Sequence, residues 1–159
     1  MQQARYLTLL FNLAVFYFFQ EDFSESKYWV QTIRDVEKPT QRKDIVHFAQ
    51  VLEVVLHFEL GNQKAVESFF RSIYRKLQSR NRLHPFERKL LNGIRRMSGE
   101  QTRKKETIFK ALGQDLIMLN PQDTTGFREI QLYIQARITG KNLKVVYLES
   151  LHRQVENES

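Results

Sequence analysis

The sequence contains no cysteine and few residues that interrupt helices, with 6 Gly and 3 Pro among 159 residues. Without cysteine, the chain cannot form disulfides, thiolate metal sites or cysteine nucleophiles. It also lacks an apolar run of about 20 residues, the length that crosses a membrane, because the run at 6–19 ends before Gln20. No small-residue cleavage site follows that run, which disfavours a signal peptide. These absences predict long helices, no membrane span and a cytoplasmic location.

Recognised catalytic and cofactor-binding motifs are lacking too. The four histidines stand in no familiar ligand spacing: His47, His57, His84 and His152. The glycines are too scattered for a phosphate-binding loop, and neither a nucleophile motif nor a paired-carboxylate pattern occurs. We therefore expect no catalytic residues, no metal site and no cofactor.

A helix–turn–helix pattern is clearest at residues 56–74. Glycine ends a helix because it adopts the left-handed conformation without a Cβ clash, and asparagine caps the N–H groups of the next helix, so Gly61 and Asn62 mark a tight turn. Apolar residues then recur at helical spacing: Ala65, Val66, Phe69, Phe70, Ile73 and Leu77. The pattern predicts two antiparallel helices joined by this turn.

The same unit recurs along the chain. Turn signals fall near residues 21, 61, 99 and 140, spaced 40, 38 and 41 residues apart, and no alternating strand pattern competes with them. A period of about 40 residues built from helix pairs indicates a helical solenoid. We therefore predict a single all-α domain, a right-handed superhelix of four antiparallel helix pairs. The expected units span residues 6–38, 41–82, 86–119 and 123–156.

The first unit resembles a tetratricopeptide repeat (TPR). The positions that carry the resemblance are Leu10, Leu13, Ala14 and Tyr17 in the W-x2-L-G-x2-Y pattern, Ser26 and Val30 in A-x3-F, and Pro39 near the closing proline. Ala14 replaces the usual glycine and Ser26 the usual alanine, and the period exceeds the family's usual length of about 34 residues. The array is therefore TPR-like, and it is similar to the C-terminal part of uncharacterised bacterial proteins with such helical arrays.

The resemblance implies a concave surface, formed by the first helix of each pair, that takes peptides. The matching positions are Phe11, Val15, Phe18, Phe48, Val51, Val55, Phe58, Lys89, Arg96, Ile130, Ile134 and Arg137. Their mixture of apolar and basic side chains suits a segment that carries apolar and acidic residues. The alternative is that the aromatic positions simply form core between neighbouring helices.

Basic residues are concentrated in one region. Residues 71–110 hold 13 Lys and Arg against 3 Glu, so this region carries +10 in a chain whose net charge is +7. Its members define the basic patch: Arg71, Arg75, Arg88, Lys89, Arg95, Arg96, Arg103, Lys104 and Lys105. Cations at a helix start oppose the macrodipole, so the last three do not serve helix stability. The patch suits phosphates or an acidic partner, and the alternative is an ordinary solvated face.

These patterns favour a non-catalytic scaffold that binds a protein or peptide partner. The alternatives are a nucleic-acid-associated protein acting through the basic patch and a regulatory domain of a larger protein. Residues 6–19 are apolar around the whole helix, so one neighbouring helix cannot cover them. Because exposed apolar surface promotes association, we expect either further repeats before this segment or self-association through it.

Overall fold

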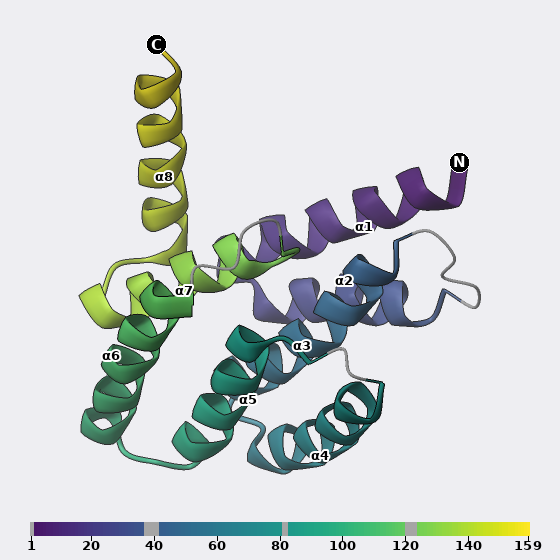
Figure 1. Cartoon of the computed structure of the whole chain (residues 1–159), viewed down its shortest axis with the longest axis vertical. Helices are drawn as coiled ribbons and strands as arrows, with labels where there is room; N and C mark the ends of the chain where they lie inside the picture. Colours follow the sequence, from purple (N-terminus) through teal and green to yellow (C-terminus); the bar gives the residue numbers. More distant parts are fainter. Residues whose placement is uncertain (1, 37–41, 81–82, 120–123) are drawn as a thin grey trace.

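The computed structural model describes residues 2–36, 42–80, 83–119 and 124–159, and over these residues it is all-helical, with no strand (Figure 1). The helices are α1 (Gln2–Phe19), α2 (Phe23–Arg34), α3 (Lys43–Glu59), α4 (Gln63–Ser79), α5 (Pro85–Met97), α6 (Thr102–Leu119), α7 (Phe127–Thr139) and α8 (Leu143–Glu158). The all-α prediction is confirmed for this part of the chain. The unit boundaries expected at 38, 41, 82 and 123 lie outside the described residues.

The turns of the first two helix pairs are built in the same way. At Glu21 and Gly61 the backbone φ is positive, 60° and 72°. These residues and the ones after them donate backbone N–H groups to carbonyls three and five positions back, which is a Schellman ending. Asp22 and Asn62 then cap the following helices by accepting from the N–H three positions on. Local structure therefore repeats after 40 residues, as the sequence period predicts.

Helix α3 is the central helix of the core. Residues 51–57 are all buried, and α3 contacts α1, α2, α4 and α5. A helix enclosed on most sides must be apolar around most of its circumference, which explains its nearly continuous run of Val, Leu and Phe. In the flanking helices the buried positions are Val30 and Phe70, whereas the preceding Trp29 and Phe69 are half-buried.

The C-terminal helices also pack against the first helix. The ring of Phe18 lies 5.5 Å from that of Tyr133 on α7, and Phe19 stacks on Tyr147 of α8 at 4.7 Å. Figure 1 shows α7 beside the end of α1, with α8 extending away from the body of the fold. An array in which each repeat contacts only its neighbours would not join its first and fourth units. The superhelical arrangement therefore stays a prediction. No helix in the described ranges is long and apolar enough to cross a membrane.

The start of α3 is tied to the segment before α7 by Asp44. Its carboxylate accepts two hydrogen bonds from the Arg42 guanidinium, at 3.0 and 2.9 Å, and one from the Thr125 hydroxyl at 2.7 Å. The Arg42 hydrogen bonds and, after them, the Thr125 bond outweigh burial and lower the pKa of Asp44 from 3.8 to about 2.

Asp44→Asn is expected to reduce the acid sensitivity of the fold. A carboxylate whose folded pKa is depressed stabilises the protein above its unfolded pKa, and this stabilisation is lost as pH falls from about 4 towards 2. Urea unfolding at intervals between pH 5 and pH 2 should therefore show a smaller loss of stability in the variant than in the wild type. Identical pH profiles would contradict this account of Asp44.

Candidate functional site

An apolar groove of about 540 Å³ lies between α1, α7 and α8. Its apolar walls are formed by Leu9, Phe11, Leu13, Val15, Phe16, Phe19, Leu132, Tyr147 and Leu148. Its polar members are Asn12, Gln20, Arg128, Glu129 and Lys144. The groove exists because α7 and α8 pack on the last turn of α1 and leave its earlier turns uncovered on that side.

Large apolar side chains of this groove are exposed to solvent. Leu9 and Phe16 on α1 are each 55 % exposed, and Leu148 on α8 is 44 % exposed. The opposite side of α1, including Leu7 and Leu10, is buried in the core. Single exposed apolar residues are common, whereas neighbouring ones around a concavity mark interaction sites. The apolar residues of α1 therefore lie on two sides of the helix: one side packs into the core and the other lines the groove.

The polar members give the groove a small positive excess. Arg128 donates to the Ser150 hydroxyl and to the Gln154 amide oxygen, both at 3.1 Å, so its charge faces neutral groups. Lys144 is exposed, and neither it nor Arg128 forms an ion pair within the described part of the chain. Glu129 is the acid of the lining. An acidic group on a partner would meet unpaired cations here.

Half of the residues that the TPR resemblance assigns to the concave surface lie in the core. The buried members are Phe18, Phe48, Val51, Val55, Ile130 and Ile134. They are enclosed because α3 is surrounded by its neighbours and α7 packs on α1, and partner binding by these residues stays a prediction. Phe11 and Val15 are half-buried and do line the groove on α1, and half-buried Phe58 lies beneath the Lys105 ammonium at 5.3 Å.

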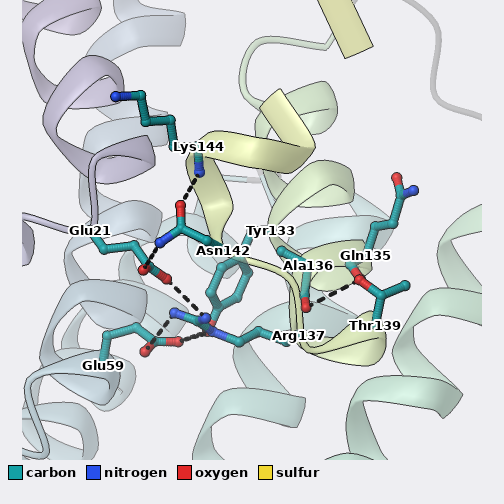
Figure 2. A network of polar contacts seen from close by, with 9 residues as sticks. All are labelled: Glu21, Glu59, Tyr133, Gln135, Ala136, Arg137, Thr139, Asn142 and Lys144. Atoms are coloured by element: carbon teal, nitrogen blue, oxygen red, sulfur yellow. Dashed lines mark hydrogen bonds and ion pairs between the residues drawn. The ribbon is translucent and has the colours of Figure 1, made fainter. Parts of the chain in front are cut away.

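Arg137 lies at the centre of a polar network that joins α7 to the first two turns (Figure 2). Its Nε and Nη2 donate to the two carboxylate oxygens of Glu59 at 3.0 and 3.1 Å, and its Nη1 donates to Glu21 at 3.1 Å. The Tyr133 hydroxyl also donates to Glu59, at 2.6 Å, and the Asn142 amide donates to Glu21. The guanidinium of Arg137 is thus occupied by two carboxylates of this chain, and partner binding by Arg137 stays a prediction.

The protonation states in this network are set by burial and by Glu59. Burial, together with the adjacent carboxylate, raises the pKa of Tyr133 well above 10, so the phenol remains a donor at neutral pH. Burial opposes the charge of Arg137, but Glu59 outweighs it and raises the guanidinium pKa further. Tyr133 and Arg137 therefore keep their protons at neutral pH and donate to carboxylates from distant segments of the chain.

The basic patch is exposed but partly neutralised. Arg71, Arg75, Arg88, Lys89, Arg95, Arg96, Arg103 and Lys104 are exposed, and Lys105 is half-buried. Glu67 accepts from Arg71 at 2.9 Å and from Arg95 at 3.1 Å, while Lys89 pairs with Asp115 at 3.2 Å and Lys104 with Glu100 at 2.6 Å. Lys89 and Arg96 are exposed on α5 and do not line the groove between α1, α7 and α8.

Two histidines and a buried glutamate meet where α3 packs against α5. Glu87 is fully buried, and both its carboxylate oxygens lie 2.7 Å from Nε2 of His47. One ligand atom from each of His47, His84 and Glu87 lies within 4.8 Å of the others. Motif spacing missed this cluster because its members belong to different helices. No local pattern links the pair, since Glu87 follows His47 by 40 residues.

A second buried polar cluster lies between α2, α3 and α4. Burial raises the pKa of Glu53, opposed by Arg34, whose guanidinium donates to it at 2.8 Å. Burial also lowers the pKa of His57, whose ring stacks on Phe69 at 4.8 Å. Within the described ranges, both ring nitrogens of His57 and the Trp29 indole N–H are buried without a hydrogen-bond partner. The cluster lies inside the core, and none of its residues lines the groove.

Fold and site together define an all-α helical protein with an apolar groove between its first and last helices. Comparison with family models, with curated proteins and with solved structures found no match. The TPR-like relationship therefore stays a prediction, and the functional argument depends on the groove and its neighbouring charges.

Proposed function

We propose that this chain is a non-catalytic helical scaffold that binds an amphipathic helix carrying acidic residues in the groove between α1, α7 and α8. The observation that carries the proposal is the set of neighbouring exposed apolar side chains Leu9, Phe16 and Leu148. Burying a large apolar side chain is worth about 1.5–3 kcal/mol relative to leaving it exposed. A partner that covers all three therefore gains most of its affinity from them.

The shape and charge of the groove specify the partner. A hydrophobic groove between helices accepts the apolar face of another helix, with anchors at positions i, i+3 or i+4, and i+7. The side chains of Arg128 and Lys144 stand among the apolar ones and form no ion pair with the described residues, so acids flanking the anchors are favoured. Such charges contribute to specificity and association rate more than to affinity.

The scaffold is proposed to be a TPR-like array of four helix pairs. The 40-residue period and the matching turn and cap hydrogen bonds of the first two units support this assignment. In this proposal the binding surface differs from the concave face of the TPR family. It arises where the fourth unit meets the first, through the contact of Tyr133 with Phe18.

Selection of phage-displayed helical peptides on the wild-type chain tests the proposal. The selected peptides should carry apolar residues at helical spacing with Asp or Glu beside them. Phe16→Glu should weaken their binding about tenfold or more, because it places a charge in the apolar wall. Met118→Glu is the matched control, since Met118 is 85 % exposed on α6 and does not line the groove. Peptides that bind the Phe16 variant as tightly as the control would refute the groove as the site.

Binding of nucleic acid through the basic patch is the second candidate. It is favoured by Arg88, Arg96 and Arg103, which are exposed and form no ion pair within the described part of the chain. Phosphate contacts give an affinity that falls steeply as salt rises, whereas an apolar groove does not. A salt titration of any ligand of this chain therefore assigns it to one surface or the other.

A further inference from the structure

The buried carboxylate of Glu87 lies among imidazoles rather than among lysines or arginines. It accepts a hydrogen bond from the backbone N–H of His84 at 3.1 Å and contacts Nε2 of His47 with both oxygens at 2.7 Å. Within the described ranges no Lys or Arg pairs with Glu87. Buried charges in proteins are paired or coordinate a metal. One N–H shared between two oxygens forms a three-centre bond that is poorly aligned with each of them, so the single Nε2–H of His47 is a weak match for this carboxylate.

The donor atoms at this point converge from two helices. His47 is on α3, and His84 immediately precedes Glu87's helix α5. The two imidazole rings lie 5.7 Å apart at a steep angle, and the three candidate ligand atoms all lie within 4.8 Å of one another. Imidazole nitrogen and carboxylate oxygen form a donor set that zinc sites use, with two histidines and one glutamate holding the ion and a fourth position open.

We propose that His47, His84 and Glu87 bind one divalent transition-metal ion, for which Zn²⁺ is the best match. In a tetrahedral site with bonds of about 2.0–2.1 Å, the ligand atoms lie about 3.3 Å apart. The site therefore forms when the exposed imidazole of His84 turns inward by about 1–2 Å and the contact between His47 and Glu87 opens from 2.7 Å to about 3.3 Å. His47 and Glu87 already stand in contact, and the metal takes the place of the proton between them.

The residues around the site indicate which group fills the fourth coordination position. A pocket of about 280 Å³ adjoins His47 and is lined in part by Lys43, Lys76 and Arg80, which are exposed. These cations oppose a bare dication, and they favour an anion or a polarised water at the open fourth position. Because the ligands come from α3 and from the start of α5, the bound ion links these two helices.

Titration of the full chain with ZnCl₂ in phosphate-free buffer, followed by calorimetry, tests the proposal. His84→Ala is the informative variant, because it removes one ligand but keeps the backbone N–H and the contact between His47 and Glu87. His152→Ala is the matched control, since it removes an exposed histidine on α8. We expect one Zn²⁺ per chain, an affinity about tenfold or more weaker in His84→Ala, and no change in His152→Ala.

Thermal unfolding gives a second measurement that does not depend on calorimetry. A ligand that binds the folded state alone raises the unfolding midpoint, so Zn²⁺ should raise it clearly less for His84→Ala than for the wild type and His152→Ala. Co²⁺ should give the visible absorption of a tetrahedral site in the same two proteins. Saturable binding that His84→Ala leaves unchanged, or no saturable binding to the wild type, would overturn the proposal and leave the groove proposal unaffected.

Discussion

Gly126→Ala is expected to lower the free energy of unfolding by about 2–5 kcal/mol. Gly126 has φ 86°, a left-handed conformation that costs an L-residue about 1–2 kcal/mol. An added Cβ would also overlap the ring of Phe48, which is buried in the core and packs edge-on against Phe11. Forcing extra volume into a packed core costs about 1–3 kcal/mol. The two penalties add because one methyl group causes both.

Gly140→Ala is the matched control for this prediction. Gly126 and Gly140 stand at the two ends of α7, and both have positive φ. A Cβ at Gly140 meets nothing within 4 Å, so that variant isolates the backbone penalty of about 1–2 kcal/mol. Urea unfolding of both variants measures the difference. If the two costs are equal, the contact between Gly126 and Phe48 does not restrict the fold.

Arg137→Ala is expected to cost about 2–4 kcal/mol of stability. It leaves the carboxylates of Glu59 and Glu21, both partly buried, without their cation. Removing one member of a buried ion pair costs about 3–5 kcal/mol, and the partial exposure of Arg137 lowers this value through solvent screening.

Arg153→Ala provides the comparison for Arg137. Arg153 is exposed, and its guanidinium lies 3.9 Å from Glu149, so its removal should change stability by less than about 0.5 kcal/mol. Urea unfolding of both variants, with a double-mutant cycle that adds Glu59→Gln, measures the coupling between Arg137 and Glu59. A cost for Arg137→Ala no larger than that for Arg153→Ala would show that the network does not hold α7 in place.

Features of the fold that depend on neighbouring residues could be predicted from the sequence. Gly61 ends α3 and Asn62 caps α4. The residue with positive φ and the residue that supplies the capping oxygen both lie in the turn itself, so the local sequence is enough to predict them. Helical periodicity likewise assigned a buried face to residues 65–77, where Val66, Phe70 and Ile73 are buried. The all-α class follows from these local signals because no alternating apolar pattern opposes them.

Contacts between distant segments could not be predicted in this way. Apolar periodicity shows that a face is covered but does not identify what covers it. Phe48 was therefore assigned to a binding surface although neighbouring helices enclose it. The partners of Arg137 lie 78 and 116 positions away, beyond any local pattern. His47 and Glu87 are 40 positions apart, so their contact also lies beyond any local pattern.

The contact between α1 and α7 also affects how the chain folds during synthesis. Phe18 packs on Tyr133, so one face of α1 stays uncovered until more than a hundred further residues have been translated. At about 5–20 residues per second, this delay lasts roughly 5–25 s. Exposed apolar surface in such intermediates promotes aggregation and attracts chaperones. Once made, the contact joins α1 to α7, so α1 cannot detach from the fold without breaking it.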